Sequence, residues 1–179
     1  MKYRIIAVLS IAALLFTGCS ASSEDKEPLA TVAVYNALPL PDLSMDIPEG
    51  YEATSSEFYE KYYIQDDASI IVTEDTNGPF SSSYDYAALA LLEYQKVANE
   101  MEIITSEPVR GKNCSVHLLE FRYTLGEDNA ADMTCLAGFA TDGSSMYIIT
   151  CKSNTSTYSL HHDEFYTVIQ SVMMTATGQ

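Results

Sequence analysis

The sequence predicts an α+β domain: an antiparallel β-sheet of about six to seven strands flanked by two main helices. Three observations lead to this prediction. Short segments rich in apolar and β-branched residues are separated by turn residues. Apolar residues recur at helical spacing in only two places. Most segments are joined by loops short enough for hairpins, so the expected order is β-β-β-α-β-β-β-β-α within residues 43–175.

The first half of this domain supplies three strands and one helix. The expected strands are residues 43–48, 58–64 and 68–74. The first alternates apolar and polar residues and stops at a Pro-Glu-Gly turn, while Asp66-Asp67 joins the other two as a hairpin. A loop rich in Gly, Pro and Ser follows. Ser83 is then placed to cap a helix from about 84 to 101.

The second half supplies four strands and the last helix. The expected strands are residues 102–109, 114–124, 133–141 and 146–152. We expect the first of them to be interrupted at Pro108. The last two flank the turn sequence 142–145 (DGSS), a strong hairpin signal. An apolar stripe that includes Phe165 and Ile169 predicts a final helix from about 159 to 175.

This order of elements resembles the PsbP-like superfamily. Residues 47–51 (IPEGY) are similar to the I-P-x-G-(W/Y) opening of that family, and Ile169-x-Ser171 lies in the expected last helix. The resemblance covers about residues 43–174. It implies a central antiparallel sheet flanked by helices and, usually, a non-catalytic docking role. It does not imply photosynthesis or Ran binding, because no partner-binding residue of those members is matched here.

The first residues have the layout of a signal peptide. Lys2 and Arg4 precede an apolar run of about a dozen residues, which is shorter than the roughly 20 residues that a spanning helix needs. Residues 16–19 (FTGC) then resemble the bacterial lipobox, although Phe16 replaces the commoner leucine. The resemblance implies cleavage before Cys19 and diacylglycerol on its sulfur. The alternatives are an ordinary secretory signal and an uncleaved anchor.

A lipobox fixes the expected organisation and location. Residues 1–18 are expected to be the signal peptide, 19–42 the lipidated cysteine with a flexible tether, and 43–175 a single domain. Diacylglycerol supplies two acyl chains, which suffice for stable anchoring where one chain is marginal. We therefore expect the protein on the extracytoplasmic face of the cell membrane, held there through Cys19.

The charge balance narrows the expected partners. Processing would remove Lys2 and Arg4 and leave seven basic against 25 acidic residues, a net charge of −18. Nucleic acid and anionic headgroups select basic surfaces, so neither is an expected partner. Acidity suits a cationic ligand, but it also simply keeps an extracytoplasmic domain soluble.

No pattern in the chain carries catalysis, and we expect neither an enzyme nor a bound cofactor or metal. P-loop, Rossmann and Gly-x-Ser-x-Gly patterns are lacking. His117 alternates with apolar residues and is expected to be a hydrogen-bonded core or rim residue. The run 161–164 (HHDE) has metal-ligand chemistry, but only His161 and Glu164 would share a helix face. The acidic loop 126–132 lacks the spacing of a calcium-binding loop.

Three cysteines remain once Cys19 carries lipid. If the turn between the last two strands is a three-residue loop, Cys135 and Cys151 face each other and can form a disulfide. A two- or four-residue loop offsets them by one position and points them to opposite faces. In that case they are free thiols, which commonly occupy buried apolar positions. Cys114 is expected at the other end of the sheet.

The sequence thus leads to a functional hypothesis rather than a mechanism. We expect a lipid-anchored, extracytoplasmic, non-catalytic module that docks on an envelope protein. The alternative is a lipoprotein that binds a small, cationic ligand. A third and weaker candidate is an enzyme that uses His117 and Asp163.

Overall fold

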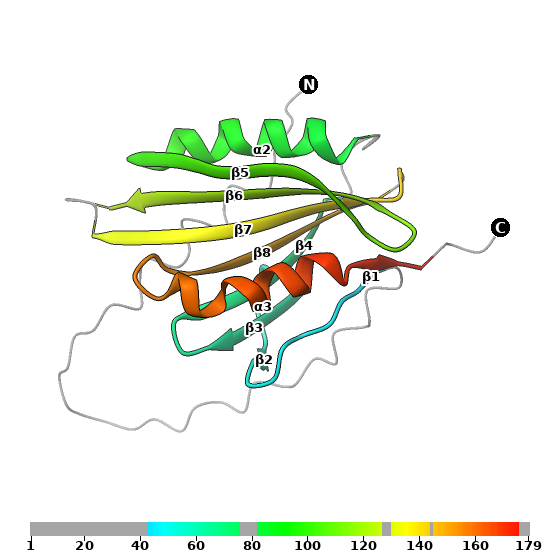
Figure 1. Cartoon of the computed structure of the whole chain (residues 1–179), viewed down its shortest axis with the longest axis horizontal. Coiled ribbons are helices and arrows are strands. Elements are labelled where there is room, and N and C mark those ends of the chain that lie inside the picture. Colours follow the sequence, from blue (N-terminus) through cyan, green and yellow to red (C-terminus); the bar gives the residue numbers. More distant parts are fainter. Residues whose placement is uncertain (1–42, 76–81, 127–129, 144, 176–179) are drawn as a thin grey trace.

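The computed structural model describes residues 43–75, 82–126, 130–143 and 145–175 (Figure 1). The expected signal peptide 1–18, Cys19 and the tether 19–42 lie outside the described residues.

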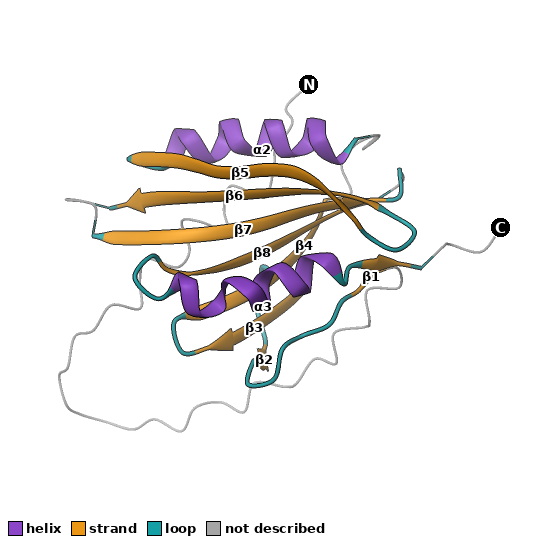
Figure 2. Cartoon of the chain, viewed as in Figure 1, coloured by secondary structure: helices purple, strands orange, loops and turns teal. Residues whose placement is uncertain are grey.

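The predicted α+β fold is confirmed: the described residues form a seven-stranded antiparallel sheet, a small two-stranded sheet and two helices (Figures 1 and 2). The spatial order of the strands is β2-β3-β4-β8-β7-β6-β5. Their bounds are β2 (Glu52–Thr54), β3 (Lys61–Gln65), β4 (Ala68–Asp75), β5 (Glu100–Arg110), β6 (Ser115–Leu125), β7 (Ala131–Thr141) and β8 (Met146–Asn154). A separate two-stranded sheet pairs β1 (Leu43–Ser44) with β9 (Met173–Met174).

The two helices cover opposite faces of the main sheet. Helix α2 (Ser83–Val97) packs over β5, β6 and β7, and α3 (Tyr158–Gln170) packs chiefly over β7 and β8. Successive residues of a strand point to opposite faces, so Leu118 joins the core beneath α3 while Leu119 joins the core beneath α2. The domain therefore has two apolar cores separated by one sheet.

Helix α3 sits directly on the backbone of β7. Gly138 lies under the helix, and a Cβ atom added there would approach Ile169 Cδ1 to 2.7 Å. Ile169 and Phe165 are fully buried at this contact. A side chain at residue 138 would push the helix off the sheet, which explains a glycine in the middle of a central strand.

The segment 43–48 is not a strand of the main sheet, and this prediction is corrected. Only Leu43 and Ser44 form a strand, and they pair with β9. Met45 and Ile47 are half-buried and pack against the core beneath α3. The apolar alternation of this segment therefore reflects one face lying on the core, which the sequence alone does not distinguish from strand pairing.

Both helices are shorter than the sequence predicts. Ser82 rather than Ser83 caps α2, accepting a hydrogen bond from the Asp85 N–H at 3.1 Å. The helix ends at Val97 because the chain must turn back to pair β5 with β6, starting at Glu100. Helix α3 ends at Gln170, and the residues beyond it pair with β1.

The strands at the two ends of the sheet also differ from the expectation. β5 runs through Pro108 without interruption, which is tolerated because β5 lies at the end of the described sheet, where one edge needs no ladder partner. A bulge between Ile103 and Thr105 shifts its register instead. At the opposite end, β2 was not predicted, because its three residues are all exposed and carry no apolar alternation.

Candidate functional site

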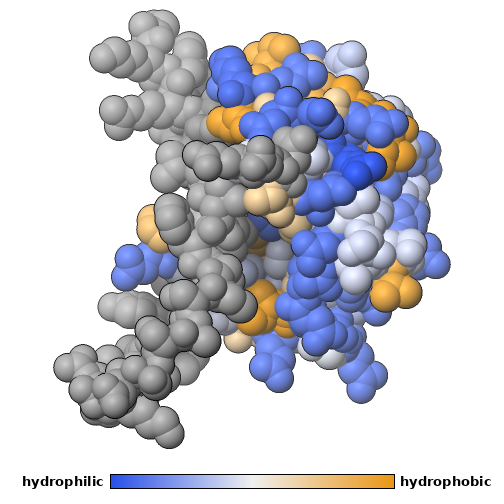
Figure 3. Space-filling model, turned by 90° about the vertical axis from the view of Figure 1, so that its left-hand side faces the viewer, coloured by the Kyte–Doolittle hydropathy of each residue, from blue (hydrophilic) through white to orange (hydrophobic). Residues whose placement is uncertain are grey.

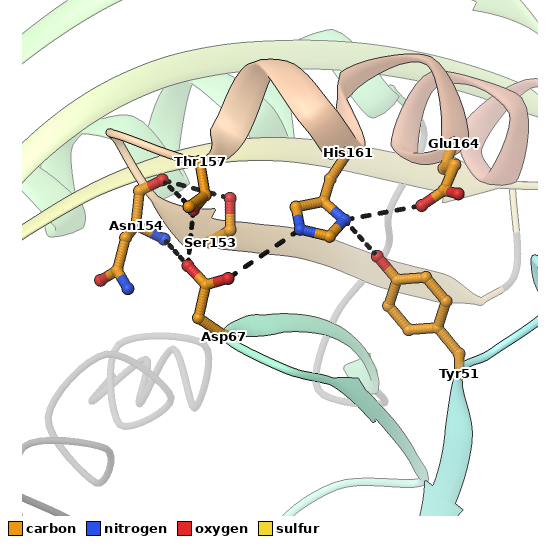
Figure 4. Close-up of polar contacts among 7 residues, drawn as sticks. All are labelled: Tyr51, Asp67, Ser153, Asn154, Thr157, His161 and Glu164. Atoms are coloured by element: carbon orange, nitrogen blue, oxygen red, sulfur yellow. Dashed lines mark hydrogen bonds and ion pairs between the residues drawn. The ribbon is translucent and has the colours of Figure 1, made fainter.

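His161 of α3 lies at the centre of a polar cluster that joins three separate segments (Figure 4). Its Nε2 lies 3.9 Å from Asp67 Oδ1 in the β3–β4 turn. Its Nδ1 lies 3.6 Å from Glu164 Oε2 and 3.4 Å from the Tyr51 hydroxyl. Tyr51, Asp67, His161 and Glu164 are called the His161 cluster below. The expected shared face of His161 and Glu164 is confirmed, whereas the other two members were missed.

Tyr51 enters the cluster from the turn that resembled the family opening. Gly50 has a φ of 95°, a backbone conformation that favours glycine because other side chains are strained there. The turn directs the Tyr51 ring onto Phe165, with ring centroids 6.5 Å apart. Burial, and then the negative charge of Glu164, raise the pKa of Tyr51. Its phenol therefore stays neutral and serves as a hydrogen-bonding group.

Asp67 is held by the chain that leads into α3. The Thr157 hydroxyl donates to Asp67 Oδ2 at 2.6 Å, and the Asn154 backbone N–H donates to the same oxygen at 3.0 Å. Burial by itself would raise the pKa of Asp67, but these hydrogen bonds outweigh it and lower the pKa. Asp67 is therefore ionised at neutral pH and faces the His161 ring.

The His161 cluster links three segments of the chain through side-chain contacts. Its members contact one another, and within the described ranges no serine or cysteine side chain is hydrogen-bonded to His161. Nor do those ranges contain any group of three or more His, Cys, Asp or Glu side chains arranged to hold a metal ion. What the arrangement does is tie the β3–β4 turn and the Tyr51 turn to α3.

Replacing Asp67 with alanine tests whether the contacts of Asp67 stabilise the folded domain. We expect Asp67→Ala to lower the free energy of unfolding by about 1–3 kcal/mol, because the Asn154 N–H loses its acceptor and the Thr157 hydroxyl keeps only its longer bond, to the Asn154 carbonyl at 3.0 Å. Asp163→Ala is the matched control, since that side chain is fully exposed, and should change it by less than about 0.5 kcal/mol. Urea denaturation at pH 7 measures the free energy of unfolding of both variants. Equal losses for the two would contradict a stabilising role of the Asp67 contacts.

The difference in the free energy of unfolding between wild type and Asp67→Ala should depend on pH, with a definite sign. A lowered pKa means that the folded chain favours the Asp67 carboxylate more than the unfolded chain does, whose value is near 3.8. The ionic contribution is therefore present above that value and is lost as the pH falls through the lower, folded pKa. The free energies of unfolding of wild type and Asp67→Ala should therefore become more similar as the pH falls.

A second polar group lies beneath α3, next to the His161 cluster. The Tyr158 hydroxyl donates to Glu120 Oε1 at 2.9 Å, and both residues are buried. His162 Nε2 lies 3.8 Å from the same oxygen. Burial, and then the charge of Glu120, raise the pKa of Tyr158. Glu120 thus obtains a donor from α3 in place of the water that it loses.

His117 has the contacts of a hydrogen-bonded core histidine. Its Nε2 lies 2.9 Å from Ser106 Oγ on β5, and its ring meets the Tyr84 ring edge-on at 5.1 Å. Burial lowers the pKa of His117, so the ring is neutral at pH 7. Asp163, paired with His117 in the weaker enzyme hypothesis, lies on α3 and therefore on the other side of the sheet.

The acidic loop 126–132 is partly described. Residues 127–129 lie outside the described residues. Asp132 accepts hydrogen bonds from Arg122 at 2.8 and 2.5 Å and from the Thr155 hydroxyl at 2.7 Å. Its oxygens therefore join β6 to β7 and to the segment after β8.

The disulfide expected for a three-residue loop is not formed. The loop from Thr141 to Met146 has four residues, so Cys135 pairs with Lys152 and Cys151 pairs with Leu136. The two thiols consequently point to opposite faces, Cys135 beneath α2 and Cys151 beneath α3, and both are free. The sequence allowed either arrangement of the two cysteines, and the register of β7 with β8 shows the one in which they are offset by one position.

The three thiols should differ in reactivity. Burial raises the pKa of Cys135 to about 12 and also raises the pKa of Cys151, whereas Cys114 is only half-buried. Because the thiolate is the reactive species, we expect a Cys19→Ala form to react with Ellman's reagent only at Cys114 when folded, and at all three when denatured. A single thiol in the denatured, unreduced protein would instead indicate a Cys135–Cys151 bond.

A strip of exposed apolar side chains lies on α2 and β5, away from the polar clusters. It consists of Tyr84 (61% exposed), Leu89 (54%), Leu92 (54%), Ile103 (45%) and Ile104 (52%), and it is called the α2–β5 strip below. Figure 3 looks onto the end of the molecule where α2 finishes and β5 begins, and apolar surface is visible there among hydrophilic residues. Residue spacing does not predict this strip, because apolar residues in a helix are ordinarily expected to be buried.

One acidic residue lies next to the α2–β5 strip: Asp85 is exposed and follows Tyr84 in the first turn of α2. Glu100 and Glu102 pair with Thr124 and Arg122, so they lie on the face of β5 opposite to Ile103, which pairs with Phe121 beneath α2. On α2, Lys96 Nζ lies 2.5 Å from Glu93 Oε1.

No helix in the described part of the chain is long and apolar enough to cross a membrane. The lipid-anchor prediction for Cys19 concerns residues outside that part and stays a prediction.

The comparisons with known proteins identify the fold alone. No protein family model and no curated protein sequence matches the chain. Several solved structures are similar, and three of them are described here. Cyanobacterial PsbP from Synechocystis is 11% identical, with a TM-score of 0.53 over 82% of this chain and 100% of that one. LpqN, involved in cell envelope biogenesis of Mycobacterium tuberculosis, is 9% identical, with a TM-score of 0.55 over 74% and 83%.

The third is a protein of unknown function from Pseudomonas aeruginosa, 14% identical, with a TM-score of 0.50 over 67% of this chain and 94% of that one. At such identities only the architecture is shared. The arrangement expected from the IPEGY turn and the element order is nevertheless confirmed: this chain has the PsbP-like α+β fold.

Proposed function

We propose that this protein is a lipid-anchored docking module that binds an envelope protein on the extracytoplasmic face of the membrane without catalysing a reaction. The observation that carries the proposal is the α2–β5 strip. Soluble domains tolerate single exposed leucines, but large side chains gathered on one helix face and the neighbouring strand indicate an interaction site. The lipobox-like residues 16–19 support the location.

Two further points support a binding role. The polar clusters of the described residues are occupied by structural contacts: His161 fastens two turns to α3, and His117 is bonded to Ser106. LpqN, which has a similar fold, is involved in cell envelope biogenesis. A docking module in the cell envelope accounts for both points and for the acidic, soluble character of the chain.

Crosslinking in living host cells tests the proposal. The full-length protein is crosslinked, purified, and its captured proteins are quantified, with a Cys19→Ala form as the control. We expect one envelope protein to dominate and to be depleted at least ten-fold in the control, because the anchor concentrates the module at the membrane. Enrichment of no protein over background would overturn docking and favour the small, cationic ligand.

A further inference from the structure

We propose that Lys152 is the anchor of a binding site for a small molecule that has one carboxylate group and an apolar body. The site lies on the α2 side of the main sheet, where β3, β4 and β8 are neighbours. It is separate from the α2–β5 strip, and its occupancy does not depend on the docking function.

Lys152 is a buried cation without a partner. Its side chain is 6% exposed, and it forms no hydrogen bond or ion pair with any residue that the structure describes. Buried charges are ordinarily paired, because an unpaired ion loses its hydration without compensation. Burial lowers the pKa of Lys152 to about 8, so most molecules still carry the proton at pH 7. The chain has 25 acidic residues, yet this ammonium group has no ion pair with a carboxylate in the described part.

The register of the sheet places a second hydrogen-bond donor beside Lys152. Cys151 belongs to the core beneath α3, so Lys152 points to the α2 side of the sheet. There it pairs with Cys135 on β7 and with Ser69 on β4. Ser69 is also buried, and its hydroxyl forms no hydrogen bond with another described residue. A carboxylate has two oxygens and can accept from the ammonium group and from this hydroxyl.

Apolar side chains continue the site along β3. Ile64 pairs with Ser69, and Tyr62 lies two residues earlier on the same face of the strand. Ile64 is 39% exposed and Tyr62 is half-buried, and neither belongs to the core beneath α2 or to the core beneath α3. Helix α2 makes its main contacts with β5, β6 and β7 rather than with β3. Because β3 lies two strands from β8, the apolar body of the ligand would span about 10 Å.

The charges of the chain limit the ligand to a small molecule. A polyanion or an anionic membrane surface would be repelled by the net charge of −16. One buried ammonium group matches one carboxylate, and an apolar body adds affinity through the surface that it buries on β3.

The effect of Lys152 on stability agrees with a binding role. Methionine has a similar length and no charge to bury, so lysine is not the residue that stability favours at this position. Residues that lower stability are typical of functional sites. A bound carboxylate would give the ammonium group the partner that it lacks among the described residues.

Titration calorimetry with three ligands of equal chain length tests this proposal. Octanoate, 1-octanol and octylammonium are each titrated at pH 7 into the full-length chain carrying Cys19→Ala, which needs no detergent. We expect octanoate to bind at one site with a Kd at least ten-fold lower than that of 1-octanol, because only the carboxylate pairs with Lys152. Octylammonium should bind more weakly than 1-octanol, because like charges repel.

A variant and a change of pH identify the residue responsible. Lys152→Met should raise the Kd of octanoate at least ten-fold and leave that of 1-octanol unchanged, while Lys112→Met, at an exposed lysine, should change neither. Circular dichroism verifies that both variants are folded. At pH 10, above the pKa of about 8, the amine is mostly neutral, so the Kd of octanoate for the unsubstituted Lys152 form should rise at least three-fold.

Several outcomes would overturn the carboxylate site. They are equal affinity for the three ligands, preference for octylammonium, no binding of octanoate at millimolar concentration, and an unchanged Kd of octanoate in folded Lys152→Met. Preference for octylammonium would in addition favour the cationic ligand. None of these outcomes affects the docking function, which the capture of an envelope protein in host cells tests separately.

Discussion

Replacing Phe165 with alanine is expected to lower the free energy of unfolding by about 3–5 kcal/mol, the range for removing a buried aromatic side chain. Phe165 is fully buried where α3 meets the sheet. Its ring lies 6.0 Å from that of Tyr158, 5.8 Å from that of His161 and 6.5 Å from that of Tyr51, measured between centroids. Its loss leaves a cavity beneath α3 and removes the support of the His161 cluster.

Such a loss is comparable with the whole stability of an ordinary domain, about 5–15 kcal/mol. Urea denaturation followed by circular dichroism measures it. Leu160→Ala on the same helix is the control, because that side chain is 76% exposed, and should change the free energy of unfolding by less than about 0.5 kcal/mol. A loss below about 1 kcal/mol for Phe165→Ala would mean that α3 is not seated on the sheet.

Replacing Lys152 with methionine is expected to stabilise the protein by up to about 3 kcal/mol at pH 7. Lys152 is 6% exposed on β8, and burial lowers its pKa from 10.5 to about 8, with Cys135 acting weakly in the opposite direction. Each unit of pKa shift corresponds to about 1.4 kcal/mol between the two protonation states. At pH 7 the folded chain therefore bears the cost of a buried ammonium group, which methionine does not carry.

The sign of the pH dependence distinguishes this cause from a general packing effect. Below about pH 8 Lys152 is protonated in both folded and unfolded chains, so the cost is fully present. Between pH 8 and 10.5 the folded chain loses the proton first, and the cost disappears as the pH rises. The advantage of Lys152→Met should thus shrink below about 1 kcal/mol at pH 10.

Comparing each variant with wild type at the same pH removes the titration of the tyrosines and cysteines from the result. Lys112→Met is the matched control, because Lys112 is exposed, and it should be neutral at both pH values. An advantage of Lys152→Met that persists unchanged at pH 10 would assign the effect to packing rather than to charge burial.

The spacing of apolar residues was sufficient to predict most of the helices and strands. The hairpin around Asp66-Asp67 and the long strand later found as β6 followed from residue spacing and turn chemistry, and both are present. These signals are local, because alternation along a strand or spacing along a helix depends only on which side faces the core. Element ends were less accurate, as the last residues of both expected helices show.

The candidate sites depended far more on long-range contacts. Sequence spacing brought His161 and Glu164 together, but Tyr51 lies 110 residues away and reaches His161 only through the Gly50 turn. The α2–β5 strip likewise exists because α2 buries one face and β5 lies at the end of the described sheet. The positions of apolar residues in the sequence do not show which of them are buried against another segment.

The sequence by itself determined the α+β class, the order of the elements and the acidic character of the chain, while the lipid anchor at Cys19 stays a prediction. Only the tertiary structure decided that residues 43–44 pair with β9, that a four-residue loop separates Cys135 from Cys151, and that α2 keeps an apolar outer face. The physical reason is the same in each case. Secondary structure follows from local spacing, whereas register, pairing and exposure depend on segments far apart in the chain.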